Sequence, residues 1–111
     1  FVTVSGTSGG WEYIKYASGL AMMWCNVTTK YSAASVLEKW VSYPFALQAG
    51  VVAFGTLEGV GSNAGAALGW NVKIVPQSDN KNARVFVHNP SGSFGGADAL
   101  TVAVLVLGRW K

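Results

Sequence analysis

The chain ends in the run Ala99-Leu-Thr-Val-Ala-Val-Leu-Val-Leu-Gly108, which is followed at once by Arg109-Trp110-Lys111. A half-buried strand alternates apolar and polar residues, because successive side chains point to opposite faces of the sheet. This run does not alternate, and its valines and leucines are typical of a strand that excludes water from both faces. The core of one small domain covers one of these faces. We therefore expect a second copy of the chain to cover the other.

Length and composition predict one all-β domain. The 111 residues fit a single domain over residues 1–111. Half of the residues are apolar and 12% are charged, whereas soluble domains carry about a quarter charged residues. Low charge together with 14 glycines favours an all-β domain that hides part of its surface in an oligomer.

Turn residues separate the expected strands, and no segment of useful length has helical periodicity, which predicts an antiparallel β-sandwich. Pro44 places its strand at an edge or a bulge, because proline lacks the donor that a central strand needs. Ser35-Val-Leu-Glu38 resembles a helix capping box, but the segment is too short for a helix. The strands are expected over residues 1–5, 11–18, 20–31, 41–48, 51–58, 66–75, 83–89 and 99–108.

The pattern of apolar residues also predicts which faces are buried. Residues 70–74 and 84–88 alternate between apolar and polar side chains, as half-exposed strands do. The strand that begins at Leu20 is different, because both of its faces are apolar. One face carries Leu20, Met22 and Trp24, and the other carries Ala21, Met23 and Cys25.

Several classes of function are disfavoured. The net charge of +3 is spread over scattered lysines and arginines, whereas a nucleic-acid surface gathers them in a basic stripe. No run reaches the roughly 18 apolar residues of a membrane span, so we expect no membrane insertion. The single cysteine and single histidine predict no metal site and no cofactor. The five carboxylates form no recognised catalytic motif, so we expect no enzyme, although distant loops can still assemble a glycosidase pair.

Three motifs resemble one family. Residues 10–24, GWEYIKYASGLAMMW, resemble the hairpin pattern GWxYxKWxSGxxxxW of C-terminal domains in bacteriophage tail fibre and baseplate proteins. Tyr16 stands where a tryptophan is common. Residues 43–47, YPFAL, are similar to the YPFAF strand of these domains, and residues 107–111, LGRWK, are similar to their IGRWK ending.

The resemblance implies the C-terminal tip domain of a phage fibre. On this view the domain is part of the virion, forms a homotrimeric β-sandwich head and binds a receptor on the bacterial surface, with a glycan favoured over a protein. Two alternatives stay open: a structural domain that trimerises and caps the fibre, and a polysaccharide-degrading tail spike domain.

Candidate ligand-binding residues are aromatic or polar residues near expected loops, because exposed loops on a rigid sandwich carry much of the binding in such folds. Sugars present flat apolar faces that stack on exposed aromatic rings, and their hydroxyls bond to amides and carboxylates. Trp11, Trp24, Trp70 and Trp110 lie in expected strands and are assigned to the core or to subunit contacts. The candidates are Trp40, Tyr43, Asp79, Asn80, Asn82 and Phe94.

Overall fold

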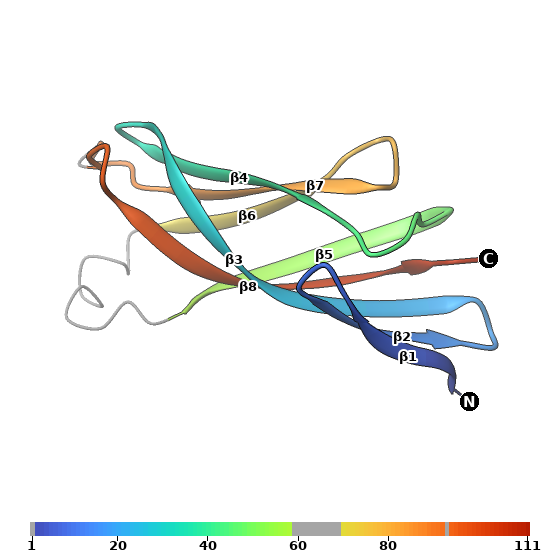
Figure 1. Cartoon of the computed structure of the whole chain (residues 1–111). Coiled ribbons are helices and arrows are strands. Elements are labelled where there is room, and N and C mark those ends of the chain that lie inside the picture. The colour runs from blue at the N-terminus through green and yellow to red at the C-terminus, as the bar shows by residue number, and fades with distance from the viewer. Residues whose placement is uncertain (1, 59–69, 93) are drawn as a thin grey trace.

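The structure is a computed structural model that describes residues 2–58, 70–92 and 94–111, and it is all-β and antiparallel, as expected (Figure 1). Within these residues there is no helix, and so no helix that could cross a membrane. The strands are β1 (Val2–Ser8), β2 (Trp11–Tyr16), β3 (Leu20–Ala33), β4 (Val36–Ser42), β5 (Ala49–Glu58), β6 (Asn71–Pro76), β7 (Asn82–His88) and β8 (Ala99–Arg109).

The long strand β3 organises the sheet. One of its edges pairs with β8 along residues 20–30. Its other edge pairs first with β2, up to Trp24, and then with β4, from Lys30 onward. The sheet therefore runs in the order β1-β2-β3-β4-β7-β6, and β8 followed by β5 continues it from the edge of β3 opposite β2 and β4.

The sheet curls into a half-barrel, so that β4, β7 and β6 lie across from β3, β8 and β5 (Figure 1). This curl forms the two layers of the fold, and the core lies between them. Leu37, Val85 and Val87 from one layer and Met23, Val102 and Val106 from the other are fully buried. β5 packs against β6 without pairing to it. The contact is close at Gly55, where an added Cβ would lie 2.7 Å from Ile74 Cδ1.

The last strand has two apolar faces, as the sequence predicts. β8 lies between β3 and β5, so both of its backbone edges are paired. Val102, Val104 and Val106 point into the core and are at most 2% exposed. Leu105 and Leu107 lie on the opposite face and are half-buried.

The prediction of a strand at residues 41–48 is wrong, because the strand in this region, β4, begins at Val36 and ends at Ser42. Leu37 points inward and pairs with Val87 of β7, and this pairing outweighs the resemblance of residues 35–38 to a helix cap. Residues 43–48 instead form an irregular segment. The other described strands differ from expectation by a few residues at their ends, and residues 66–69 of the strand expected at 66–75 lie outside the described residues.

Candidate functional site

The structure brings five of the six candidate residues to one end of β4 and β7. Trp40 lies near the end of β4 and is 52% exposed. Tyr43 follows β4 directly, and Asp79, Asn80 and Asn82 form the turn that leads into β7. Phe94 lies at the other end of β4, where its amide donates to the Ala34 carbonyl.

Tyr43 and Phe94 are core residues, each 8% exposed. The ring of Phe94 packs edge-on against Trp70 with centroids 5.3 Å apart, and the ring of Tyr43 packs edge-on against Trp11 at 6.0 Å. Burial, with a smaller contribution from the charge of Asp79, raises the pKa of Tyr43 to about 12. Its hydroxyl oxygen is buried without a hydrogen-bond partner among the described residues.

The turn at residues 77–82 is held by Asp79. Its Oδ1 accepts from the amides of Lys81 at 2.9 Å and Asn82 at 3.2 Å, and its Oδ2 accepts from Asn82 Nδ2 at 2.7 Å. These bonds, led by that from the Lys81 amide, hold the pKa of Asp79 below its usual value. Asn80 has a φ of 58°, a left-handed conformation that asparagine tolerates better than most residues.

This turn is also hydrogen-bonded to the irregular segment that follows β4, residues 43–48. The Tyr43 amide donates to the Lys81 carbonyl at 2.8 Å, and the Leu47 amide donates to the Asn80 carbonyl at 2.9 Å. The Asn80 side chain donates to the Gln48 carbonyl at 3.2 Å. Asp79, Asn80 and Asn82, which the sequence analysis proposed as ligand-binding residues, therefore also form hydrogen bonds that hold the turn and the neighbouring segment together.

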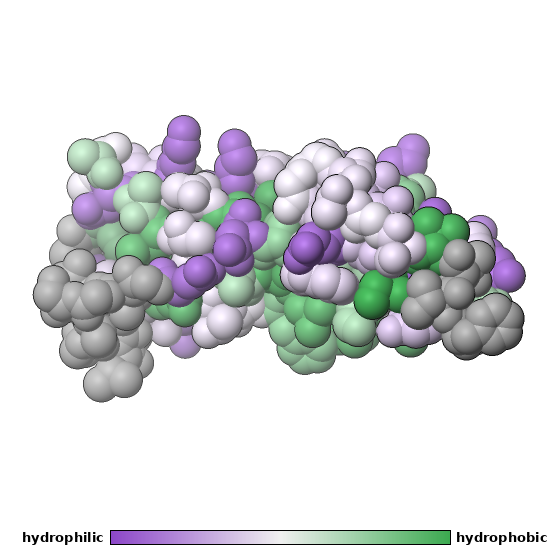
Figure 2. All heavy atoms as spheres, turned by 60° about the horizontal axis from the view of Figure 1, so that its bottom comes forward, coloured by the Kyte–Doolittle hydropathy of each residue, from purple (hydrophilic) through white to green (hydrophobic). Residues whose placement is uncertain are grey.

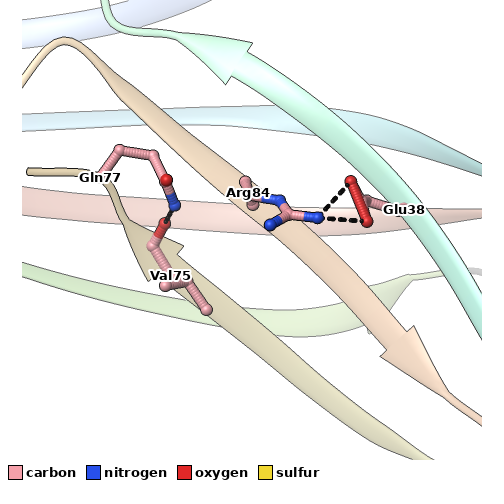
Figure 3. A network of polar contacts seen from close by, with 4 residues as sticks. All are labelled: Glu38, Val75, Gln77 and Arg84. Carbon is pink, nitrogen blue, oxygen red and sulfur yellow. Dashed lines mark hydrogen bonds and ion pairs between the residues drawn. The ribbon is translucent and has the colours of Figure 1, made fainter. Parts of the chain in front are cut away.

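Trp40 belongs to a stacked group on the outer side of β4 and β7, which we call the Trp40 face (Glu38, Trp40, Arg84 and Phe86). The Arg84 guanidinium carbon lies 4.9 Å from the Trp40 ring centroid and 4.8 Å from that of Phe86, within the range of cation–π attraction. Arg84 Nη2 also donates to both carboxylate oxygens of Glu38, at 2.8 and 2.9 Å (Figure 3). These contacts hold the exposed ring of Trp40 in place.

Sequence reasoning missed Arg84 and Phe86 as parts of this face. Their alternation with buried Val85 and Val87 placed them on an open face of their strand, as the structure confirms. Their position beside Trp40 depends on the pairing of β4 with β7, in which Trp40 is opposite Arg84. No local pattern gives that register.

A second feature is an apolar surface on the outer side of β3, β8 and β5, which we call the apolar outer face. Met22, Leu107 and Val52 form one row across the three strands, and Trp24, Leu105 and Phe54 form the next. Val52 is 47% exposed and Phe54 55% exposed. A shallow hollow of about 410 Å³ lies between Trp24, Phe54 and Leu105. Figure 2 shows hydrophobic residues gathered at the lower middle of the molecule.

Most carboxylates are engaged in structural bonds. Glu12 accepts from the Trp24 indole at 2.7 Å, Glu38 binds Arg84, and Asp98 accepts from the Gly95 amide at 2.7 Å. Asp79 holds its turn, as described above. Among the residues described here, no group of three or more histidine, cysteine or acidic side chains could hold a metal ion.

Comparison with known proteins gives a fold. No protein-family model matches the sequence, and no curated protein is significantly similar to it. The structure of an N-truncated R1-type pyocin tail fibre is similar, with a TM-score of 0.66 and 18% identity over 96% of this chain and 84% of that chain. A longer C-terminal part of the P. aeruginosa R1 pyocin fibre has a TM-score of 0.64 and 16% identity, over 96% of this chain and 28% of that chain. This chain thus has the fold of the C-terminal fragments of R1-type pyocin tail fibres.

Proposed function

We propose that this chain is the C-terminal tip domain of a phage-type tail fibre, and that it binds a glycan on the surface of the host bacterium. The likeness to R1 pyocin fibre fragments extends over 96% of the chain and agrees with the motifs at residues 10–24, 43–47 and 107–111. The domain is then a component of the virion. Folds host many functions, so the binding role is argued from surface residues.

The observation that carries the binding role is the fixed, exposed ring of Trp40. Arg84 holds the ring by cation–π contact, and Glu38 holds Arg84. An aromatic ring that is already ordered loses little conformational entropy when a sugar stacks on it. The polar turn that contains Asp79 and Asn82 lies at the same end of β4 and β7 as Trp40, and Asn82 accepts a hydrogen bond from Ser42 there. Its side chains offer hydrogen-bonding groups to sugar hydroxyls.

We propose binding without cleavage. A glycosidase needs two carboxyl groups across a groove, one of them able to donate a proton. Glu12, Glu38, Asp79 and Asp98 are each committed to a structural hydrogen bond. A reducing-end assay on capsule or wall polysaccharide is expected to detect no release. Release that disappears in Glu58→Gln or Asp79→Asn would support the tail spike alternative.

We further propose that the domain is a homotrimer, with the apolar outer face in the subunit contact. An exposed surface that carries Trp24, Val52, Phe54 and Leu105 side by side is unusual on a monomer and typical of an interaction site. This face also favours the structural alternative, in which the domain trimerises and caps the fibre. Binding of a bacterial glycan by the domain would support the receptor role over the purely structural role.

The experiment is a glycan array probed with the purified domain and with two aromatic variants. Trp40→Ala is expected to weaken binding about tenfold, because truncation of an aromatic hot spot typically costs over 1 kcal/mol. Tyr31→Ala is the matched control, since Tyr31 is 43% exposed and lies outside the Trp40 face. No binding by the unmodified domain to any bacterial glycan or host cell would reject the receptor role.

A further inference from the structure

The sheet has a gap beside β3 that the proposed binding face does not use. β2 pairs with β3 up to Trp24, and β4 begins to pair with it at Lys30. Residues 25–29 of β3 therefore have no partner strand on that edge among the described residues, although β8 pairs with them on the other edge. Alternate residues of an unpaired edge direct their backbone N–H and C=O groups outward, so this gap offers free hydrogen-bonding groups.

The gap forms a cleft of about 540 Å³, which we call the β3 cleft. Its lining includes the buried residues Trp11 and Tyr43, which are 3% and 8% exposed. The Trp11 indole donates to the Ser42 carbonyl at 2.8 Å and so joins β2 to the end of β4 across the gap. The turn at residues 8–10 and the polar side chains of Asn26 and Thr28 form other parts of the wall.

The charged residues that line the cleft within the described part of the chain are two lysines, Lys30 and Lys39. Glu38 is opposite Lys30 in the pairing of β3 with β4 but does not line the cleft. Both lysines are exposed, and neither forms an ion pair with a described residue, since Glu38 is paired with Arg84. Two unpaired ammonium groups at a concave surface attract an anion more strongly than scattered surface charges do, because a cleft concentrates the field.

We propose that the β3 cleft binds an anionic saccharide, a sugar that carries phosphate or carboxylate groups, through Lys30 and Lys39. This inference rests on the proposed receptor role and names the chemistry of the receptor. The cleft adjoins the turn at residues 77–82 through Ser42, which lines the cleft and whose hydroxyl donates to Asn82 Oδ1 at 2.8 Å. One oligosaccharide then places its anionic unit in the cleft and a neighbouring sugar near the polar side chains of this turn.

The test measures binding of the full domain to phosphorylated, uronic-acid-containing and neutral oligosaccharides immobilised on an array. The double variant Lys30→Glu, Lys39→Glu is expected to lose at least tenfold in binding to the anionic sugars and to lose most of the salt dependence. Lys30→Arg, Lys39→Arg keeps the charge and is expected to bind within about threefold of the unmodified domain. The phosphorylated and uronic-acid arms identify which anion is bound.

A control for net charge is the double variant Lys73→Glu, Lys111→Glu, because both lysines are exposed and lie outside the cleft. It carries the same net charge as the cleft variant and is expected to bind like the unmodified domain. All four lysines are exposed. Lys30 is opposite Glu38 in the pairing of β3 with β4, so Lys30→Glu is expected to lower the free energy of unfolding by up to about 1 kcal/mol, and the other three substitutions by less than about 0.5 kcal/mol each. Equal losses in the two glutamate variants would show a general charge effect and would overturn the cleft assignment.

Other results separate this inference from the proposed function. Binding of anionic sugars that survives in the cleft variant, or binding of neutral sugars alone, overturns the cleft assignment and leaves the receptor role intact. Host-cell binding through a protein, with no sugar bound on the array, also overturns it and points to addition of a peptide strand at the free edge of β3. Absence of any binding to sugars and cells overturns the receptor role itself.

Discussion

The indole nitrogen of Trp11 lies 2.8 Å from the carbonyl oxygen of Ser42, so that a residue at the start of β2 is bonded to the end of β4, 31 positions along the chain. This bond spans the gap that β2 and β4 leave along β3. It ties the hairpin that carries β1 and β2 to the layer that carries Trp40. This bond therefore adds a link between the β1–β2 hairpin and the end of β4 to the pairing of β3 with β4.

Trp11→Phe is expected to lower the free energy of unfolding by about 1–3 kcal/mol, because the Ser42 carbonyl loses its donor and the smaller ring leaves a space. Urea unfolding at one fixed protein concentration measures the change. Trp40→Phe is the control, since Trp40 is 52% exposed and its replacement is expected to cost less than about 0.5 kcal/mol. Equal effects of the two variants would contradict the role given to Trp11.

Gly55→Ala is expected to destabilise the fold by about 1–3 kcal/mol, because the new methyl group would have to displace the packed side chains of Ile74 and Val72 in β6. The added Cβ would lie 2.7 Å from Ile74 Cδ1 and 3.1 Å from Val72 Cγ1. At Gly96 an added Cβ meets nothing within 4 Å, so Gly96→Ala is the control in the same urea experiment. An unchanged midpoint in Gly55→Ala would show that β5 and β6 are not in close contact.

Alkaline pH is expected to destabilise the fold through Tyr43. Burial raises the phenol pKa from 10.0 to about 12 in the folded state, so the unfolded chain loses this proton first. The contribution is constant below about pH 10 and falls as the pH rises toward 12. The Cys25 thiol, whose pKa burial raises from 9.0 to about 11, adds a similar loss that starts one unit lower.

Tyr43→Phe separates the two groups. The variant is expected to match the unmodified domain in stability at neutral pH, because its hydroxyl has no hydrogen-bond partner among the described residues. It is expected to lose less stability than the unmodified domain between about pH 10 and 11. Identical alkaline slopes for the two proteins would show that Tyr43 ionises as freely in the fold as in the unfolded chain.

Val104→Asp is expected to prevent folding. Val104 is 2% exposed, and the core cluster of the described residues contains no lysine or arginine. An unpaired buried carboxylate costs several kcal/mol, about as much as a small domain's whole stability. Ala99→Asp, at the exposed start of β8, is expected to fold normally. The soluble yield and the far-ultraviolet circular dichroism spectrum distinguish the outcomes, and a native spectrum for Val104→Asp would show that this position is not in a dry core.

The terminal strand could be predicted from residues 99–108 alone, because a run without alternation demands cover on both faces. The inward-pointing valines are buried. The outward-pointing Leu105 and Leu107 lie beside apolar residues of β3 and β5 on the same face of the sheet. The alternation of Val85 and Val87 with Arg84 and Phe86 was equally readable. These patterns depend on side-chain direction within one strand, which sequence spacing fixes.

Features that depend on pairing between strands could not be predicted. Residues 36–42 contain the adjacent charged residues Glu38 and Lys39, which interrupt the apolar pattern of a strand. The partner strand β7 lies at least 40 positions away in the sequence. Trp40 was identified by its position near an expected loop, but its contact with Arg84 follows from that distant pairing. The β3 cleft likewise exists because β2 and β4 pair with different stretches of β3, and no local sequence motif indicates where these pairings stop.

The most direct test of the account is the mass of the domain in solution. The apolar outer face is proposed as a trimer contact, so sedimentation equilibrium at micromolar concentration is expected to give three times the chain mass of 11.7 kDa. Leu105→Asp, which places a charge on that face and leaves the core valines unchanged, is expected to give a folded monomer. A stable monomer formed by the unmodified chain would contradict the account.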